Sequence, residues 1–188
     1  GLCLVGSEMC IRDRLCPNET PEGQNCGLVK NAAQMIDVSE EVPEDEVKAL
    51  LAEAGVNSNP EGWAEGSRIH VNGDIFGLHK DPNRLVSQFK RRRRQGKIRS
   101  EVSLRHDALN RDIFINTDRG RMLRPLLILD GGNLTLTPED LDRLRSGEWS
   151  FNDLVTNGIV EWVDAEEEED LLIACLLYTS DAADELCR

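Results

Sequence analysis

Hydrophobic residues recur at the spacing of an α-helix in four short stretches of this chain. The stretches begin at Pro43, Asp81-Pro82, Thr137-Pro138 and Ser150. Each of these starts is a proline or a residue that commonly caps a helix, and a glycine follows each stretch. The apolar faces of the four predicted helices consist of Val47, Leu50, Leu51 and Ala54; Leu85, Val86 and Phe89; Leu141 and Leu144; and Phe151, Leu154 and Val155.

Short apolar runs between these helices predict β-strands. In the segment 68–79, Asn72-Gly73 indicates a β-hairpin, because a type I′ turn needs positive φ at both central residues. Further strands are predicted at 102–104, 113–115, 125–129 (as a buried strand, before a turn at Gly131-Gly132) and 159–163. Helices and strands do not alternate as regular βαβ units, so the sequence predicts an α+β fold of mixed short strands and helices.

The composition limits the class of protein. The 188 residues are 39% apolar but only 4% aromatic, so a core must consist mainly of Leu, Val and Ile. A formal net charge of −13 argues against a free-standing nucleic-acid-binding protein, although a part of an assembly can be acidic and still present one face to nucleic acid. The longest apolar run, 171–177, is too short for a membrane span, so we expect no membrane partner.

The cysteines and histidines do not form a recognisable site. No Cys-x-x-Cys pair occurs, and His70, His79 and His106 lie far from the six cysteines in sequence. Because zinc ligands usually come in closely spaced pairs, we expect no metal site and a reduced, intracellular chain. None of the histidines has a nearby Ser, Cys or Asp arrangement that would indicate catalysis.

The segment from Leu15 to Asn31 has hardly any apolar periodicity. Its unusual residues are Cys16, Pro17, Pro21, Gly23, Cys26 and Gly27. Proline fixes φ and glycine permits positive φ, so the segment is predicted to be an irregular, tightly turned loop. Loops of this kind on a rigid scaffold often carry function, which makes this segment the candidate site.

The run Leu-Cys-Pro-Asn-Glu-Thr-Pro-Glu-Gly-Gln-Asn-Cys-Gly-Leu-Val-Lys-Asn resembles the signature at the end of the fork region in the second-largest subunit of multisubunit DNA-directed RNA polymerases. The resemblance covers nearly all of residues 14–174, and the loop is more similar to archaeal than to bacterial sequences. A eukaryotic nuclear or viral homologue remains an alternative. Further matching stretches follow in the same order: Val71-Asn72-Gly73, Gly77, His79, Asp81-Pro82, 115–118, Gly120-Arg121, 124–126 and 164–169.

The resemblance implies a division of the chain. Residues 14–35 would be the end of the fork region, with the active-centre loop, and two small external-type domains would follow at 36–125 and 126–174. Residues 1–13 and 175–188 resemble peptides translated from sequencing-adapter nucleotides, so we expect both to be non-native tails. The alternative is that they are genuine tails of the chain.

The resemblance also implies roles for individual residues. Glu22 and Gln24 would lie beside the active centre, close to the RNA 3′ end and the incoming nucleotide. Apart from the resemblance, the ammonium group of Lys30 is a point charge on a flexible stem that could pair with a phosphate. Pro21, Gly23 and Gly27 would provide loop geometry, and this chain would contribute no catalytic residue. The alternatives are that Glu22 and Gln24 only stabilise the loop and that Lys30 is an ordinary surface residue.

The function implied is DNA-templated RNA synthesis by nucleotidyl transfer, within the full complex only. The family's Mg²⁺ is held by aspartates of the largest subunit, in a motif absent here, so the isolated chain is expected to be inactive and to bind no cofactor. Expected partners are the other polymerase subunits, especially the largest, with the DNA template and the RNA product. The location would be cytoplasmic in an archaeon and nuclear in a eukaryote. Two alternatives remain: a standalone acidic protein-interaction module derived from this subunit without nucleic-acid binding, and an independent hydrolase, for which no nucleophile–base pair is evident.

The chain contains two runs of like charge. The basic run 90–94 is interpreted as a solvated helix end, with nuclear localisation or RNA contact as the alternative. The acidic run 164–170 is interpreted as a solvated face, with a magnesium cluster as the alternative.

Overall fold

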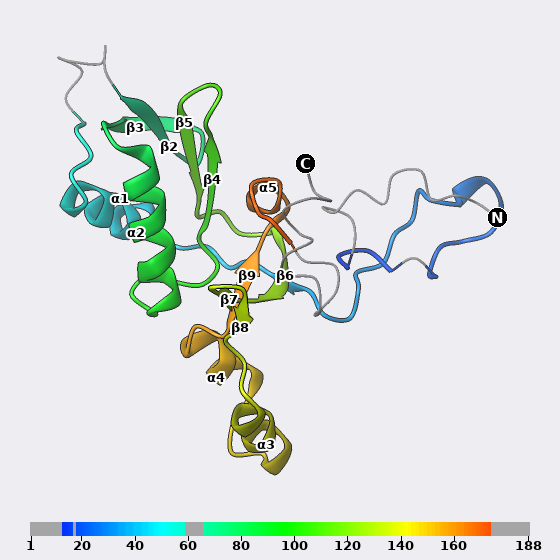
Figure 1. Ribbon diagram of the computed structural model, residues 1–188. Helices are drawn as coiled ribbons and strands as arrows, with labels where there is room; N and C mark the ends of the chain where they lie inside the picture. Colours follow the sequence, from blue (N-terminus) through cyan, green and yellow to red (C-terminus); the bar gives the residue numbers. More distant parts are fainter. Residues whose placement is uncertain (1–12, 17, 59–65, 174–188) are drawn as a thin grey trace.

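The computed structural model describes residues 13–16, 18–58 and 66–173. Its larger sheet has four strands in the order β3-β2-β5-β4 (Figure 1). The parallel pair β2–β5 lies at the centre, and the outer pairs β2–β3 and β4–β5 are antiparallel. The bounds are β2 Ser67–Val71, β3 Asp74–His79, β4 Ser103–Asp107 and β5 Asp112–Asn116.

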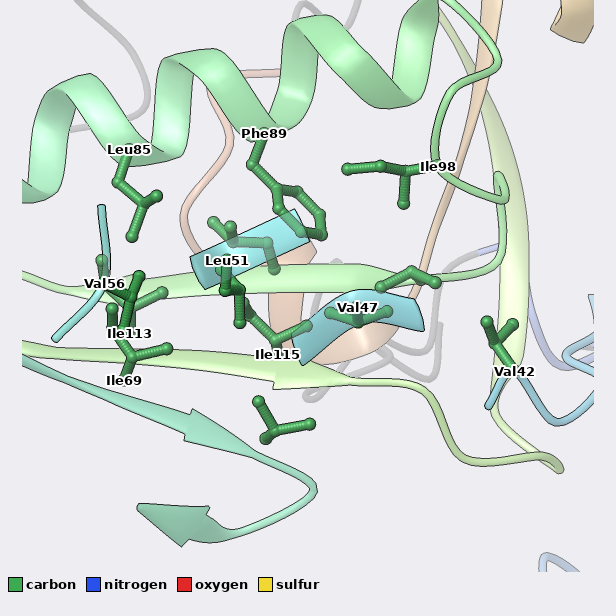
Figure 2. Close-up of a cluster of buried hydrophobic side chains, with 13 residues drawn as sticks. Val42, Val47, Leu51, Val56, Ile69, Leu85, Phe89, Ile98, Ile113 and Ile115 are labelled. Carbon is green, nitrogen blue, oxygen red and sulfur yellow. The ribbon is translucent and has the colours of Figure 1, made fainter. Parts of the chain in front are cut away.

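Two helices, α1 (Glu44–Glu53) and α2 (Pro82–Arg94), cover one face of this sheet. Figure 2 shows side chains of α2 and α1 packed against those of the strands. Each buried Val, Leu, Ile or Phe contributes about 1.5–3 kcal/mol, so this cluster is the main hydrophobic core. Its members are Val42, Val47, Leu51, Val56, Ile69, Val71, Leu85, Phe89, Ile98, Val102, Leu104, Ile113 and Ile115.

The predicted hairpin at Asn72-Gly73 is confirmed. Asn72 has φ 50° and Gly73 has φ 93°, as a type I′ turn requires. The register of β2 on β3 shifts between Ile69 and His70, which is the sign of a β-bulge. Ile75 is 46% exposed, whereas Gly77 and Leu78 further along β3 are buried.

The predicted helix starts are also confirmed. The Asp81 side chain accepts a hydrogen bond of 3.0 Å from the Arg84 amide at the start of α2. At α3 (Pro138–Ser146), Thr137 and Asp140 form a reciprocal capping box. At α4 (Phe151–Thr156), the amide and hydroxyl of Ser150 donate to Asp153.

Two smaller sheets lie outside the four-stranded sheet. β1 (Asp37–Val38), β6 (Met122–Leu127) and β9 (Val160–Val163) form a sheet in the order β1-β6-β9, and α5 (Ala165–Glu168) follows β9. A short hairpin consists of β7 (Leu129–Asp130) and β8 (Asn133–Leu134). A small apolar cluster holds α3 and α4 together: Leu136, Leu144, Trp149, Leu154, Val155, Ile159 and Val160. The mixture of helices with several small sheets confirms the α+β class.

Two expectations for these elements were wrong. The segment 125–129 is not one buried strand, because β6 ends at Leu127 and a new hairpin starts at Leu129, so both leucines are more than 40% exposed. Leu141 was expected to face inward but is 38% exposed. The cluster beneath α3 is small, and Leu144 alone of the two predicted leucines packs against it.

The expected division of the chain into domains stays a prediction. Its boundary between residues 125 and 126 falls inside β6, which pairs with both β1 and β9. The expected terminal tails lie almost entirely outside the described residues. Among the helices that the structure describes, none is long and apolar enough to cross a membrane.

Candidate functional site

The segment between Arg14 and Ala33 forms a loop whose two ends lie side by side. Leu15 and Ala32 form an isolated antiparallel bridge. The Cys16 amide donates to the Asn31 carbonyl at 2.9 Å, and the Ala33 amide donates to the Arg14 carbonyl at 2.8 Å. From this base the loop extends away from the sheets (Figure 1, blue). A long surface loop with closely spaced ends is the arrangement of an Ω-loop.

The threonine side chain at position 20 bonds across the loop. Its hydroxyl accepts a hydrogen bond of 2.9 Å from the Gly27 amide and donates to the Val29 carbonyl at 3.3 Å. Asn31 adds a further bond of 3.2 Å from its side-chain amide to the Glu19 carbonyl. These bonds give the loop a defined shape although it buries almost no apolar surface.

A 3₁₀ turn, η1 (Gly23–Asn25), lies at the centre of the loop. Gly23 has φ 86° and Gly27 has φ 78°, a region that residues with a side chain rarely adopt. A Cβ atom at either glycine would meet nothing within 4 Å. The two glycines are therefore needed for the backbone conformation of the loop, and not to make room for a neighbour within the described chain.

The three candidate side chains of the loop all point to solvent. Glu22, Gln24 and Lys30 are exposed, as is most of the loop between them. Within residues 13–16, 18–58 and 66–173, no hydrogen bond or ion pair engages any of these three side chains. Their carboxylate, amide and ammonium groups are thus available to a partner outside this chain.

The base of the loop is fixed by Arg14, whose side chain is 3% exposed. Its Nε donates to the Met122 carbonyl at 3.1 Å and its Nη2 to the Val163 carbonyl at 3.0 Å. Its Nη1 forms a buried ion pair with Glu168. Glu168 also binds Arg124 through two bonds, of 3.0 Å to Nε and 2.5 Å to Nη2. No pattern in the sequence indicates this cluster.

The interpretation of the acidic run as a solvated face was wrong for three of its six acidic residues, while Glu166, Glu169 and Asp170 are exposed. Asp164, Glu167 and Glu168 are at most 3% exposed. Each carboxylate is paired with an arginine from a distant part of the chain: Asp164 with Arg121, Glu167 with Arg93, and Glu168 with Arg14 and Arg124. Burial of a carboxylate is tolerated when a cation and further hydrogen bonds compensate it.

The interpretation of the basic run as a solvated helix end was also wrong for Arg93, whereas the side chain of Arg94 is 38% exposed. Arg93 is 4% exposed, and its Nη1 and Nη2 donate hydrogen bonds of 2.7 and 2.6 Å to the carboxylate of Glu167. Arg94 binds Glu161 at 2.8 Å. Burial alone would lower the pKa of Arg93, but Glu167 and Glu161 outweigh burial and raise this pKa above its ordinary value.

Arginine partners also lower the pKa values of two buried acidic groups, Glu161 and Asp164. Burial alone would raise the pKa of Glu161, yet hydrogen bonds and charge from Arg94 and Arg93 lower it. Burial alone would also raise the pKa of Asp164. Hydrogen bonds from the Ser103 hydroxyl, the Glu167 amide and Arg121 outweigh burial and lower this pKa. Both groups are therefore held as carboxylates at neutral pH.

The described residues do not fit a magnesium site. Within them, no three His, Cys, Asp or Glu side chains are placed to hold a metal ion. Three buried carboxylates lie close together in sequence, but each already accepts a hydrogen bond from an arginine: Asp164, Glu167 and Glu168. The Nε2 atom of His70 lies 3.1 Å from Oδ1 of Asp112. Arg68 binds both oxygens of the Asp112 carboxylate, so Asp112 belongs to an ion pair on the sheet.

Three family models match consecutive parts of the chain. They are described as RNA polymerase Rpb2 domain 3 (residues 12–38), domain 4 (residues 69–130) and domain 5 (residues 151–187). Together, and in this order, they include the loop, most of the four-stranded sheet, and the segment from α4 through α5. The chain belongs to the Rpb2 family of second-largest RNA polymerase subunits.

Relatives from archaea and eukaryotes support this membership. The chain is 38% identical over 177 residues to RNA polymerase subunit Rpo2 of Sulfolobus acidocaldarius, covering 86% of this chain. It is 39% identical over 175 residues to RNA polymerase II subunit RPB2 of Encephalitozoon cuniculi, covering 91% of this chain. Drosophila melanogaster RNA polymerase III subunit RPC2 is 36% identical over 166 residues. The chain spans only about one sixth of the length of these curated relatives.

The buried ion pairs of this Rpb2-family chain join segments that match different family models. Arg14 lies in the match to domain 3, Arg124 in the match to domain 4, and Glu168 in the match to domain 5. Arg93 and Glu167 likewise join the domain 4 and domain 5 matches. The three segments are thus connected by buried charge, and α5 contributes both of the central carboxylates.

Proposed function

We propose that this chain acts in DNA-templated RNA synthesis as part of the second-largest subunit of an assembled RNA polymerase. Its relatives are named as DNA-directed RNA polymerase subunits from archaea and from the eukaryotic polymerases II and III. The reaction is nucleotidyl transfer, and this chain supplies no catalytic residue of its own. Its partners are the other polymerase subunits, above all the largest, with the DNA template and the RNA product.

The loop 15–31 lines the active centre in this proposal. The observation that carries it is the exposure of Glu22, Gln24 and Lys30 on a loop whose backbone is already held by its own hydrogen bonds. A carboxylate and an amide suit hydrogen bonds to a ribose or to basic side chains near the RNA 3′ end. An ammonium group suits a phosphate. Pro21, Gly23 and Gly27 set the path of the loop.

The magnesium ions of the reaction are held by residues outside this chain. In a two-metal mechanism the ions stabilise the attacking and leaving oxygens. The contribution of this chain is to position groups around the nucleotide, which is a large part of catalysis in phosphoryl transfer. The chain works in the cytoplasm of an archaeon or in the nucleus of a eukaryote.

The test is to replace Glu22 or Gln24 by alanine in the complete subunit and to assemble the polymerase. We expect assembly to be retained and the elongation rate or the misincorporation frequency to change. The matched control is Glu41→Ala, because Glu41 is also an exposed carboxylate but lies outside the loop. If Glu22→Ala and Gln24→Ala prevent assembly, the loop is structural and the proposal fails; it fails also if both variants behave like the control.

A further inference from the structure

We propose that Arg14 and Glu168 are positioning residues for the loop 15–31, so that a carboxylate on α5 controls where the loop presents Glu22 and Gln24. This inference rests on the proposed function of the loop. It starts from the buried cluster in which Glu168 receives Arg14 from the loop base and Arg124 from β6. Glu168 is 154 residues from Arg14 in sequence.

Arg14 is held in three directions at once. One guanidinium nitrogen donates to β6 at Met122, a second to β9 at Val163, and the third pairs with Glu168 on α5. A planar guanidinium with bonds to three separate elements has a single orientation. The carbonyl of the same residue accepts the Ala33 amide that closes the loop. The orientation of Arg14 therefore sets the direction in which the loop leaves the body of the protein.

Among the described residues, the other attachments of this segment lie just outside the loop: Asp13 pairs with Arg124, and β1 pairs with β6. No large apolar side chain is buried among the described residues of the loop, and Leu28 and Val29 are 75% and 50% exposed. Its other bonds, through Thr20 and Asn31, join parts of the loop to one another and not to the sheets. A change at Arg14 thus leaves the internal shape of the loop intact while it loosens the attachment of the loop.

The neighbouring pair, Arg93 with Glu167, provides an internal control. It has the same chemistry and a similar burial, and Glu167 precedes Glu168 in the same helix. Its arginine comes from α2, and it does not contact the loop. If the two pairs served stability alone, matched substitutions in them would have the same consequences.

The experiment compares Arg14→Lys with Arg93→Lys in the complete subunit of the assembled polymerase. Lysine keeps the charge but lacks the planar fork, so both variants are mild enough to fold. Amide hydrogen exchange is measured for peptides covering residues 15–33, and kcat and KM for nucleotide addition are measured on the same preparations. We expect Arg14→Lys to speed exchange of these peptides roughly 10- to 100-fold, the effect of losing a hydrogen bond to a charged group.

We also expect Arg14→Lys to lower kcat/KM for the nucleotide by about tenfold or more, because small misplacements of positioning groups are costly. Arg93→Lys should change neither measurement, although it lowers the melting temperature. Glu168→Asp, which keeps the charge but shortens the side chain, should reproduce Arg14→Lys. Equal effects of Arg14→Lys and Arg93→Lys on the loop, or unchanged exchange in Arg14→Lys, would overturn the inference.

The experiment also separates this inference from the function on which it rests. If Glu22→Ala slows nucleotide addition while Arg14→Lys leaves both exchange and kinetics unchanged, the loop is functional but Arg14 does not position it. If Arg14→Lys speeds exchange and neither Arg14→Lys nor Glu22→Ala alters nucleotide addition, the loop is attached as described but has no role at the active centre. The first result refutes the positioning role of Arg14. The second refutes the proposed function of the loop, and with it the proposal that Glu168 controls that function.

Discussion

Arg93 and Glu167 form a bidentate ion pair inside the protein, with both side chains buried and the two residues 74 positions apart in sequence. Arg93 lies in the last turn of α2, which covers the four-stranded sheet, and Glu167 lies in α5, which follows β9. Glu167 also accepts the Leu104 amide at 3.3 Å from β4. The contact between the two parts of the chain is therefore built around charge, and Figure 1 shows α5 beside β4 at this place.

Removal of one partner of this pair should be strongly destabilising. We expect Arg93→Met to lower the free energy of unfolding by about 3–5 kcal/mol, because it leaves Glu167 as a buried carboxylate without its main cation. The measurement is urea unfolding of the 188-residue chain. The control is Arg145→Met, which breaks a pair with Asp142 in which both side chains are more than 70% exposed. Such a pair is worth about 0–1 kcal/mol, and equal effects of both variants would contradict the prediction.

The lowered pKa values of Glu161 and Asp164 predict a loss of stability in acid. In the unfolded chain these groups titrate near their ordinary values of 4.5 and 3.8, but in the folded chain they titrate lower. Below pH 4.5 the unfolded state therefore binds more protons than the folded state, and acid favours unfolding. Their contribution should be complete at neutral pH and should fall as the pH drops below about 5.

This prediction is checked by urea unfolding at several pH values between 7 and 3. Glu161→Gln removes one of the two titrating groups, so it should make the decline of stability below pH 5 shallower, whatever its effect at pH 7. A decline as steep as in the unmodified chain would show that Glu161 does not contribute to the acid sensitivity.

The hydroxyl of Thr20 should control local order in the loop. We expect Thr20→Val to remove the bonds to the Gly27 amide and the Val29 carbonyl and to speed hydrogen exchange of the Gly27 amide. Global unfolding should change little, because the loop is exposed and adds little to the core. Thr20→Ser keeps the hydroxyl and serves as the control; faster exchange in Thr20→Ser to the same extent would contradict the role assigned to the hydroxyl.

Gly77 should tolerate no side chain, for a reason of space. A Cβ at this position would lie 2.6 Å from the Asn57 carbonyl oxygen and 2.9 Å from Val56. Because the carbonyl belongs to the backbone bridge between Asn57 and Leu78, it cannot move aside cheaply. We expect Gly77→Ala to cost about 1–3 kcal/mol, measured as a lower melting temperature. An unchanged melting temperature would mean that residue 57 shifts freely.

Signals that act between neighbours in sequence predicted local structure well. Asn72-Gly73 indicated the hairpin turn, Asp81-Pro82 the start of α2, and Thr137 the start of α3, and the structure has each of them. These signals are dependable because the groups that satisfy one another lie within four residues, so no distant part of the chain can change the outcome.

The candidate site was predicted in part. Prolines and glycines without apolar periodicity marked the loop, and its resemblance to a known signature indicated Glu22 and Gln24. The anchor of the loop was missed, because nothing in the residues around Arg14 indicates a partner that lies 154 residues away. The roles of Glu22, Gln24 and Lys30 stay predictions.

The sequence by itself determined the α+β class, the positions of the helices and the main hairpin, and the family to which the chain belongs. Tertiary structure alone decided which charged residues are buried. A run of five basic residues, or of six acidic residues interrupted by one alanine, looks solvated in isolation, since burying one charge alone is prohibitive. When folding brings Arg93 to Glu167 and Arg14 to Glu168, each charge compensates the other, and residues that appeared to form a solvated surface instead join the parts of the protein.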